Sequence, residues 1–216
     1  MIKFLSNSKF LIPAMVILAV FAASSGFYIS LKQSQNNQQP PDIEGLFWPN
    51  PKQIQDFNTL DQTGNSFGLN QIKGKWSFIF FGYTHCPDIC PVTMAVMAQT
   101  YKQLAMEHNN LQIIFVSVDP ERDSTEKLSQ YVSYFNKDFI GLGGDPEKVN
   151  SLTKQIGVAY FLNKEDQTED YLVDHSASIF VFDPMARMVG KISPPHDAEK
   201  VIEQFTKIKT FINGTL

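Results

Sequence analysis

Two runs of mainly apolar residues, 76–81 and 111–118, stand out along the 216-residue chain. Nearly continuous apolar runs of this length are typical of strands that are covered on both faces of a sheet. Between them, residues 91–108 carry apolar side chains at helical spacing, and Pro91 suits the first helical position, where its missing N–H costs nothing. The pattern therefore predicts a βαβ unit with parallel strands and a right-handed crossover.

Shorter elements surround this unit. Residues 54–60 and 67–69, separated by a turn cluster, predict a β-hairpin. Asp123 opens a capping-box motif as the expected cap of one helix, and Asp145 is the expected cap of another. The other predictions are helices at 123–136, 145–156 and 197–211, strands at 178–182 and 187–192, a short strand or turn at 139–142, and an exposed polar loop at 163–170. This order predicts an α/β chain with one mixed sheet, a thioredoxin-like fold with an N-terminal β-hairpin extension.

The N-terminal region contains 22 residues without a charge, 10–31. This stretch is long enough to span a bilayer and longer than the usual apolar region of a signal peptide. No small-x-small cleavage site follows it, so we expect a retained transmembrane anchor over a cleaved signal peptide or a buried core helix. Lys3 and Lys9 precede the stretch, and the positive-inside rule then places the bulk of the chain outside the cytoplasm.

The expected organisation follows from this anchor. We expect a cytoplasmic N-terminus at 1–9, the anchor at 10–31, a flexible polar linker at 32–43 and the thioredoxin-like domain at 44–216. The first 35 residues contain no arginine, which argues against a mitochondrial transit peptide. No cysteine lies in or just after the apolar stretch, so the sequence does not predict a bacterial lipoprotein anchor.

Composition and charge narrow the possible functions. The net charge is −4 and no basic stripe is present, so nucleic-acid binding has no support. Only two cysteines, Cys86 and Cys90, occur in the chain, too few for a disulfide framework. They follow the first apolar run and are close together in sequence, as expected for either a catalytic dithiol or part of a metal site.

The spacing of Cys86 and Cys90 favours a metal without excluding a disulfide. Redox dithiols are normally separated by two residues, whereas three residues lie between these cysteines. A regular helix would hold the two Cβ atoms ~5–6 Å apart, beyond the ~3.5–4.5 Å of a disulfide. A bound metal holds two thiolate sulfurs nearly ~4 Å apart and relaxes that demand. Pro87 and Pro91, however, disfavour helical backbone at both cysteines.

A metal site needs a further ligand beside the two thiolates, which are soft ligands suited to Cu(I). The candidates are His85, His108, His175, His196, Met94 and Met97. We expect the side chain of His85 to point elsewhere, His108 and His196 to be at the surface, and Met94 to be in the core. His175 is expected in a loop just before a strand, where a thioredoxin-like sheet brings it opposite the cysteines. Thioredoxin-like redox enzymes carry a cis-proline there, whereas this chain has no proline between Pro146 and Pro184.

With these motifs the chain resembles the Sco/SenC family of membrane-anchored copper chaperones. The matching segments are FGYTHCPDICP at 81–91, VSVDPERDS at 116–124, YLVDHSA at 171–177 and the Asp183-Pro184 turn. The resemblance covers about residues 44–213. The combination of the cysteine motif with the later Asp-His-Ser is highly specific.

The resemblance implies that Cys86, Cys90 and His175 bind one copper per chain, as Cu(I) or Cu(II). It also implies a role in delivering copper to, or reducing the cysteines of, the dinuclear copper centre in cytochrome c oxidase subunit II. The implied location is the bacterial inner membrane, single-pass, with the C-terminal domain in the periplasm. A periplasmic copper chaperone and a thioredoxin-like reductase are further partners of such a protein.

Other functions remain open on the residues alone. Cys86 and Cys90 could form the redox-active pair of an extracytoplasmic thiol-disulfide oxidoreductase. A peroxidase of the same fold needs a threonine- or glutamine-supported cysteine pocket that the sequence lacks, and a hydrolase has no support. We therefore expect a metallochaperone rather than an enzyme, with thiol-disulfide reduction as the activity it could have.

Four polar residues near the motifs have structural interpretations as well. Asp174 adjoins His175 and is expected either to support that ligand or to shape a turn. Asp119 is expected to be a turn residue before Pro120. Arg122 and Asp123 are expected to build a loop and a helix cap rather than to bind metal.

Overall fold

The computed structural model describes residues 8–36, 41–47, 49–106, 108–163 and 171–214. The chain divides into two compact units, Met1–Pro41 and Asp42–Leu216. In the first unit, α1 spans Ser8–Asn36, and its window Pro13–Ser30 has a mean hydropathy of 1.7, long and apolar enough to cross a membrane. Parts of the expected cytoplasmic segment, linker and polar loop (1–7, 37–40 and 164–170) lie outside the described residues.

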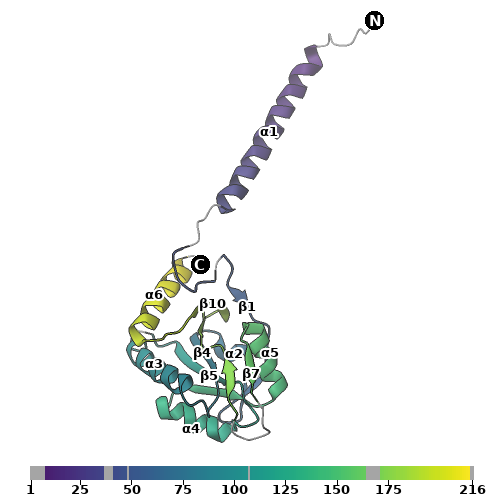
Figure 1. The fold of residues 1–216 in the computed structure, drawn as a ribbon. Coiled ribbons are helices and arrows are strands. Elements are labelled where there is room, and N and C mark those ends of the chain that lie inside the picture. Colours follow the sequence, from purple (N-terminus) through teal and green to yellow (C-terminus); the bar gives the residue numbers. More distant parts are fainter. Residues whose placement is uncertain (1–7, 37–40, 48, 107, 164–170, 215–216) are drawn as a thin grey trace. The chain divides into compact units, whose positions relative to one another are not determined.

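The second unit is built on an eight-stranded mixed sheet (Figure 1) with the strand order β1-β10-β9-β4-β5-β6-β2-β3. Its strands are β1 Lys52–Gln53, β2 Thr59–Asp61, β3 Ser66–Phe67, β4 Trp76–Gly82, β5 Leu111–Ser117, β6 Ile140–Gly143, β9 Ile179–Phe182 and β10 Arg187–Ile192. Strands β4, β5 and β6 are parallel, and β9 joins β4 in antiparallel orientation. The predicted mixed α/β architecture is confirmed.

The centre of the sheet confirms the predicted βαβ unit. Strands β4 and β5 pair in parallel, with Trp76 opposite Leu111, and every residue of both strands is buried. They are joined by helix α3, Ile89–Leu104. Phe78 of β4 meets Phe205 edge-on at 4.9 Å between ring centroids, so β4 packs directly against the last helix, α6. This rigid central layer carries the cysteine loop at the carboxyl end of β4.

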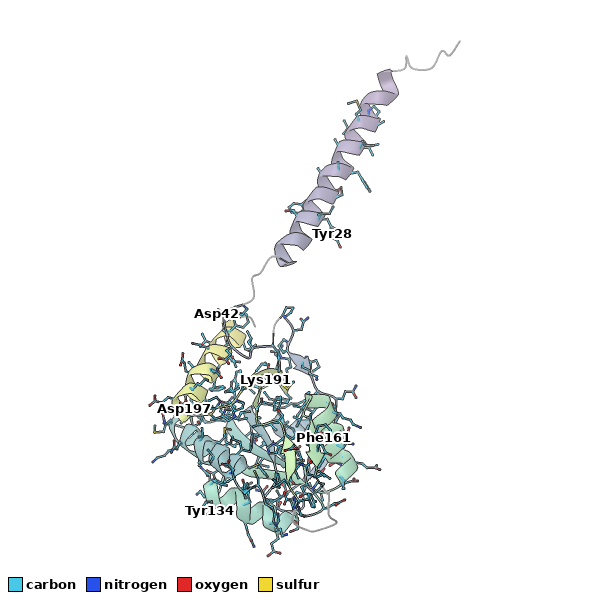
Figure 2. All side chains as sticks on the ribbon, viewed as in Figure 1. Tyr28, Asp42, Tyr134, Phe161, Lys191 and Asp197 are labelled. Carbon is cyan, nitrogen blue, oxygen red and sulfur yellow. The ribbon has the colours of Figure 1, made fainter. Side chains whose placement is uncertain are left out.

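The other helices are α2 Leu69–Ile72, α4 Thr125–Phe135, α5 Pro146–Ile156 and α6 Ala198–Gly214. In Figure 1, α3 and α6 lie along one side of the domain and α5 along the other. Figure 2 shows Tyr134 of α4 projecting outward at the edge of the domain, in keeping with its 85% exposure.

Two helix starts differ from the prediction. Helix α3 begins at Ile89, so Pro91 is its third residue rather than its first, and Cys90 is helical in spite of the proline. No N–H in the first turn has an intrahelical partner, so a proline anywhere in that turn loses no helical hydrogen bond. Helix α4 is capped by Ser124, whose hydroxyl accepts from the Lys127 N–H. Asp123 is therefore not the cap; Asp145 caps α5 as predicted.

The N-terminal part of the domain forms the predicted hairpin in a shorter version. Strands β2 and β3 pair, but the chain then turns into the one-turn helix α2 instead of extending through Leu69. Earlier, Leu46 bridges to Gly190 of β10 and β1 pairs with the same strand. The extended segment before the hairpin thus covers one edge of the sheet.

A separate two-stranded hairpin, β7 Tyr160–Leu162 with β8 Val173–His175, was not predicted. His175 is the last residue of β8, so its placement in a loop was wrong. Neither strand pairs with the eight-stranded sheet. The Ser176 N–H donates to the Ala159 carbonyl at 3.1 Å and closes the hairpin at that end.

Candidate metal centre

The two cysteines are placed by the loop between β4 and α3. Cys90 is fully buried in the first turn of α3, whereas Cys86 is half-buried in the loop before it. The Cys90 N–H donates to the Cys86 sulfur at 3.4 Å. This N–H belongs to the first helical turn and has no partner within the helix. The helix start therefore binds the Cys86 sulfur as it would bind an anion.

His175 approaches the pair from the separate hairpin, 85 residues further along the chain. Its Nε2 lies 3.2 Å from the Cys90 sulfur, and its Nδ1 lies 3.1 Å from the carbonyl oxygen of Ser176. A carbonyl can only accept, so Nδ1 carries the proton and Nε2 presents its lone pair toward the thiols. The rings of Phe80 and Tyr83 both meet the imidazole edge-on at 6.0 Å and limit its rotation.

The structure thus brings together the three predicted ligands. One donor atom from each of Cys86, Cys90 and His175 lies within 4.8 Å of the other two, the one such cluster among the described residues. Thiolate sulfurs that share one ion lie within ~4 Å of each other, so a single ion is within reach of all three groups. Two soft sulfurs and one imidazole nitrogen form a donor set suited to copper in both common oxidation states.

The two thiols have opposite electrostatic environments. Hydrogen bonding from the Cys90 thiol, opposed by burial, lowers the pKa of Cys86 to about 3. Hydrogen bonding to Cys86, followed by burial, raises the pKa of Cys90 above its ordinary value. At neutral pH the pair is therefore one thiolate, Cys86, with the remaining proton on Cys90. A thiolate is the form that attacks a disulfide or binds a metal.

The remaining predicted candidates lie outside this cluster. Met94 and Met97 are fully buried in the core. His85 is largely exposed, and its Nδ1 lies 3.1 Å from the Thr84 hydroxyl.

Two other histidines correct the prediction of surface positions. His108 is half-buried beyond α3, with its ring edge-on to Phe205 at 6.0 Å. His196 is half-buried with Nε2 2.8 Å from the Ala177 carbonyl. Neither is part of the metal cluster.

Asp123 has a different role from the predicted cap. Its buried carboxylate accepts the Thr84 N–H at 2.9 Å, the Thr84 hydroxyl at 2.6 Å and the Ser117 hydroxyl at 2.6 Å. Thr84 lies two residues before Cys86, so this carboxylate holds the start of the cysteine loop against the end of β5. The residue pattern did not predict this role because two of the three donors belong to Thr84, 39 residues earlier in the sequence.

Asp174 faces away from the thiols. Its carboxylate is exposed and accepts a hydrogen bond from the Asn163 side-chain amide at 2.9 Å. This contact joins β8 to the residue after β7. The structural interpretation of Asp174 therefore fits better than direct support of the imidazole.

Gly82 is a site residue that the sequence patterns missed. A Cβ atom at this position would lie 2.8 Å from the Cys90 sulfur and 2.9 Å from the Phe115 ring. The last residue of β4 must therefore lack a side chain for Cys90 to pack against the strand. The local signal was a single glycine between the apolar run and the cysteine motif.

A cavity of about 490 Å³ adjoins the cysteine loop on its outer side. It is lined by Thr84, His85, Pro91, Lys127, Gln130, Tyr131, Tyr134 and Phe135. The cavity thus meets the cysteine loop at Thr84 and His85, and the start of α3 at Pro91.

Comparison with known proteins agrees with this geometry. The SCO1/SenC family model matches residues 49–210, well over half of the chain. The chain belongs to the SCO1/SenC family. The resemblance seen in the sequence motifs is thereby confirmed, together with the fold that it implied.

Two sequence relatives and one solved structure illustrate the relationship within the SCO1/SenC family. The chain is 35% identical over 151 residues to a Stutzerimonas stutzeri protein named for copper binding, covering 69% of this chain and 74% of that one. It is 33% identical over 153 residues to the mitochondrial SCO1 homolog 1 of Arabidopsis thaliana, covering 70% of this chain but only 45% of that protein. The copper-bound structure of Arabidopsis thaliana ScoI has a TM-score of 0.68 at 31% identity, covering 72% of this chain and 97% of that one.

Proposed function

We propose that this protein binds one copper ion per chain through Cys86, Cys90 and His175. The observation that carries the proposal is the convergence of two sulfurs and one imidazole nitrogen within 4.8 Å. The copper-bound structure of a relative with the same fold supports copper as the ion. Copper is the cargo here, and the protein supplies a matched set of donors.

Each ligand is prepared for a distinct part in binding. Cys86 is already a thiolate, and the residue as a whole is only half-buried. Cys90 must lose its proton on binding, so copper uptake releases one proton from the pair. His175 needs no tautomer change, because the Ser176 carbonyl already holds the proton on Nδ1.

Family membership supports a proposal for the wider cellular role. Sco family proteins function in cytochrome c oxidase assembly, and a structural neighbour, BsSco, is described as a member of that family. We propose that this protein delivers copper to, or reduces the cysteines of, the dinuclear copper centre of subunit II. In this proposal α1 anchors the chain in a bacterial inner membrane, with residues 42–216 in the periplasm.

A transfer experiment tests delivery. The full-length chain in detergent, loaded with copper, is mixed with the reduced, copper-free soluble domain of an oxidase subunit II. We expect the absorption spectrum of the dinuclear copper centre to appear, and His175→Ala to abolish or greatly slow its appearance. Delivery is contradicted when the loaded parent transfers copper no faster than free copper buffered to the same concentration.

A second candidate function is thiol-disulfide reduction, favoured by the low pKa of Cys86 beside a second free thiol. In that reaction the Cys86 thiolate attacks a disulfide of subunit II, and one partner sulfur leaves as a thiolate. Cys90 then loses its proton and attacks the mixed disulfide, which releases the second partner thiol. Two electrons pass to the partner, the product is a Cys86–Cys90 disulfide, and a thioredoxin-like reductase must reset it.

The two functions are distinguished by mixing the copper-free, reduced protein with an oxidised subunit II domain and measuring the thiols of that domain. Reduction predicts partner thiols without any copper, with His175→Ala retaining most of the rate. Delivery alone predicts no change in the partner until copper is supplied and its cysteines are reduced by another agent.

A further inference from the structure

The strand that carries His175 continues a regular alternation that begins at Tyr171. Tyr171 and Val173 are buried, Leu172 and Asp174 are exposed, and His175 is half-buried. Alternate residues of an extended chain point to the same side. Tyr171 and His175 therefore face the domain together, and whatever fixes Tyr171 also fixes the side on which the imidazole lies.

Tyr171 is fixed by two side chains from the loop after β5. Its hydroxyl donates to Asp119 Oδ1 at 2.6 Å, and both groups are buried. The Arg122 guanidinium lies over the Tyr171 ring, 3.5 Å from the ring centroid, in cation–π contact. Arg122 Nε also donates to the other oxygen of Asp119. Tyr171, Asp119 and Arg122 thus each contact the other two.

The backbone of Asp119 connects this arrangement to the cysteine loop. The Asp119 N–H donates to the Ser117 hydroxyl oxygen at 3.0 Å, and that hydroxyl donates to Asp123 at 2.6 Å. Asp123 in turn accepts the N–H and hydroxyl of Thr84, two residues before Cys86. A continuous path of hydrogen bonds therefore runs from the histidine strand, through the end of β5, to the cysteine loop.

The histidine strand needs such a connection. Among the strands that the structure describes, β8 pairs with β7 alone, and a two-stranded hairpin is marginally stable by itself. Backbone hydrogen bonds at both ends of β8, from the Ser176 N–H to the Ala159 carbonyl and from the Asn163 N–H to the Leu172 carbonyl, attach it to residues that flank β7 rather than to the large sheet. Side-chain contacts of Tyr171 supply the second attachment.

We propose that Tyr171 is a positioning residue for the copper site, where together with Asp119 and Arg122 it holds His175 at bonding distance from the thiols. The inference rests on the proposed ligand set of Cys86, Cys90 and His175. In this role Tyr171 is not itself a ligand of the ion. It acts by fixing the strand four residues before the ligand.

The test removes one hydroxyl. Tyr171→Phe in the full-length chain keeps the ring under Arg122 but leaves the buried Asp119 oxygen without its donor. Removing a group that supports a metal ligand typically weakens metal binding by ~10–100-fold. We expect the Cu(II) dissociation constant to rise by about that factor and the imidazole-nitrogen coupling in the Cu(II) EPR spectrum to weaken toward that of His175→Ala.

Tyr160→Phe is the matched control. Tyr160 lies directly opposite His175 in the β7–β8 pair, and its hydroxyl makes no hydrogen bond among the described residues. This variant loses an equivalent hydroxyl next to the same ligand without touching the Asp119 arrangement. We expect its Cu(II) affinity to stay within about threefold of the parent and its EPR spectrum to be unchanged.

A metal-free measurement tests the role of Tyr171 independently of copper binding. In the reduced, copper-free chain, NMR of the imidazole nitrogens is expected to show one sharp Nδ1–H form of His175 in the parent and in Tyr160→Phe. In Tyr171→Phe we expect these signals to shift or broaden well below the unfolding temperature. Unchanged His175 signals together with an unchanged Cu(II) spectrum in Tyr171→Phe, even with a lowered melting temperature, would overturn the inference. A parent without nitrogen coupling would refute the ligand set instead, and the metal-free spectra would still decide the role of Tyr171.

Discussion

Gly82 offers a quantitative test of how tightly the cysteine pair is packed. In Gly82→Ala the new Cβ would lie 2.8 Å from the Cys90 sulfur, whereas ordinary contact begins at 3.4 Å. The difference between these two distances requires a shift of about 0.6 Å. Metal–donor distances hold to within ~0.2 Å. The displacement is thus about three times what a bound ion tolerates.

The expected losses follow from this crowding. The Phe115 ring, 2.9 Å from the same Cβ, blocks an easy shift in the other direction. Overpacking of this kind lowers the free energy of unfolding by ~1–3 kcal/mol. We expect Gly82→Ala to show that loss in urea unfolding followed by tryptophan fluorescence, and to weaken Cu(I) binding by ~10–100-fold in competition with a chromogenic chelator.

Gly143→Ala is the control for crowding without a thiol. Gly143 ends β6 of the same sheet, and its Cβ would lie 2.7 Å from a methyl carbon of Leu128. We expect an equal or smaller loss of stability and parental Cu(I) affinity. If Gly82→Ala binds Cu(I) as tightly as Gly143→Ala does, the packing argument for the cysteine pair is wrong.

Three further predictions concern stability and protonation. Ser124→Ala removes the cap of α4 and is expected to lower the free energy of unfolding by about 1 kcal/mol, measured by urea unfolding. The Cu(II) spectrum is expected to be unchanged, and a changed spectrum would contradict a purely capping role for Ser124. Asp123→Asn weakens three hydrogen bonds at a buried site and is expected to lower the free energy of unfolding by about 1–3 kcal/mol in the same assay. A loss no larger than that of an Asp→Asn change at an exposed position would contradict the role of this carboxylate. Because the pKa of Cys86 is lowered to about 3, its alkylation by iodoacetamide in reduced, copper-free protein is expected to be nearly independent of pH between roughly 5 and 8, instead of rising tenfold per unit as for an ordinary thiol. The same shift adds stability that is lost as the pH falls from the ordinary thiol pKa of 9.0 toward about 3, because over that range the unfolded chain binds a proton that the folded chain does not.

The central sheet could be predicted because its signal is local. The apolar runs around Phe78 and Ile113 allow one arrangement, a pair of strands covered on both faces, and the intervening helix makes them parallel. The three proposed ligands were also predicted from the sequence, although His175 was singled out by a missing proline and by family resemblance. Spacing alone left the choice between a disulfide and a metal open.

The supporting residues could not be predicted because their partners are distant in sequence. Asp123 looks like a helix cap from its neighbours, yet its donors include Thr84, 39 residues earlier. Tyr171 meets Asp119 across 52 residues, and neither residue type signals the other. Gly82 matters only because Cys90 folds back against it. Such roles depend on the packed domain rather than on any local pattern.

The most direct test of the proposed site is X-ray absorption spectroscopy of the Cu(I)-loaded full-length chain. The three-residue site predicts one copper per chain, with a first coordination shell that contains two sulfur atoms from Cys86 and Cys90 and one imidazole nitrogen from His175, and with the nitrogen absent in His175→Ala. A shell of sulfur alone in the parent, identical to that of His175→Ala, would contradict the site.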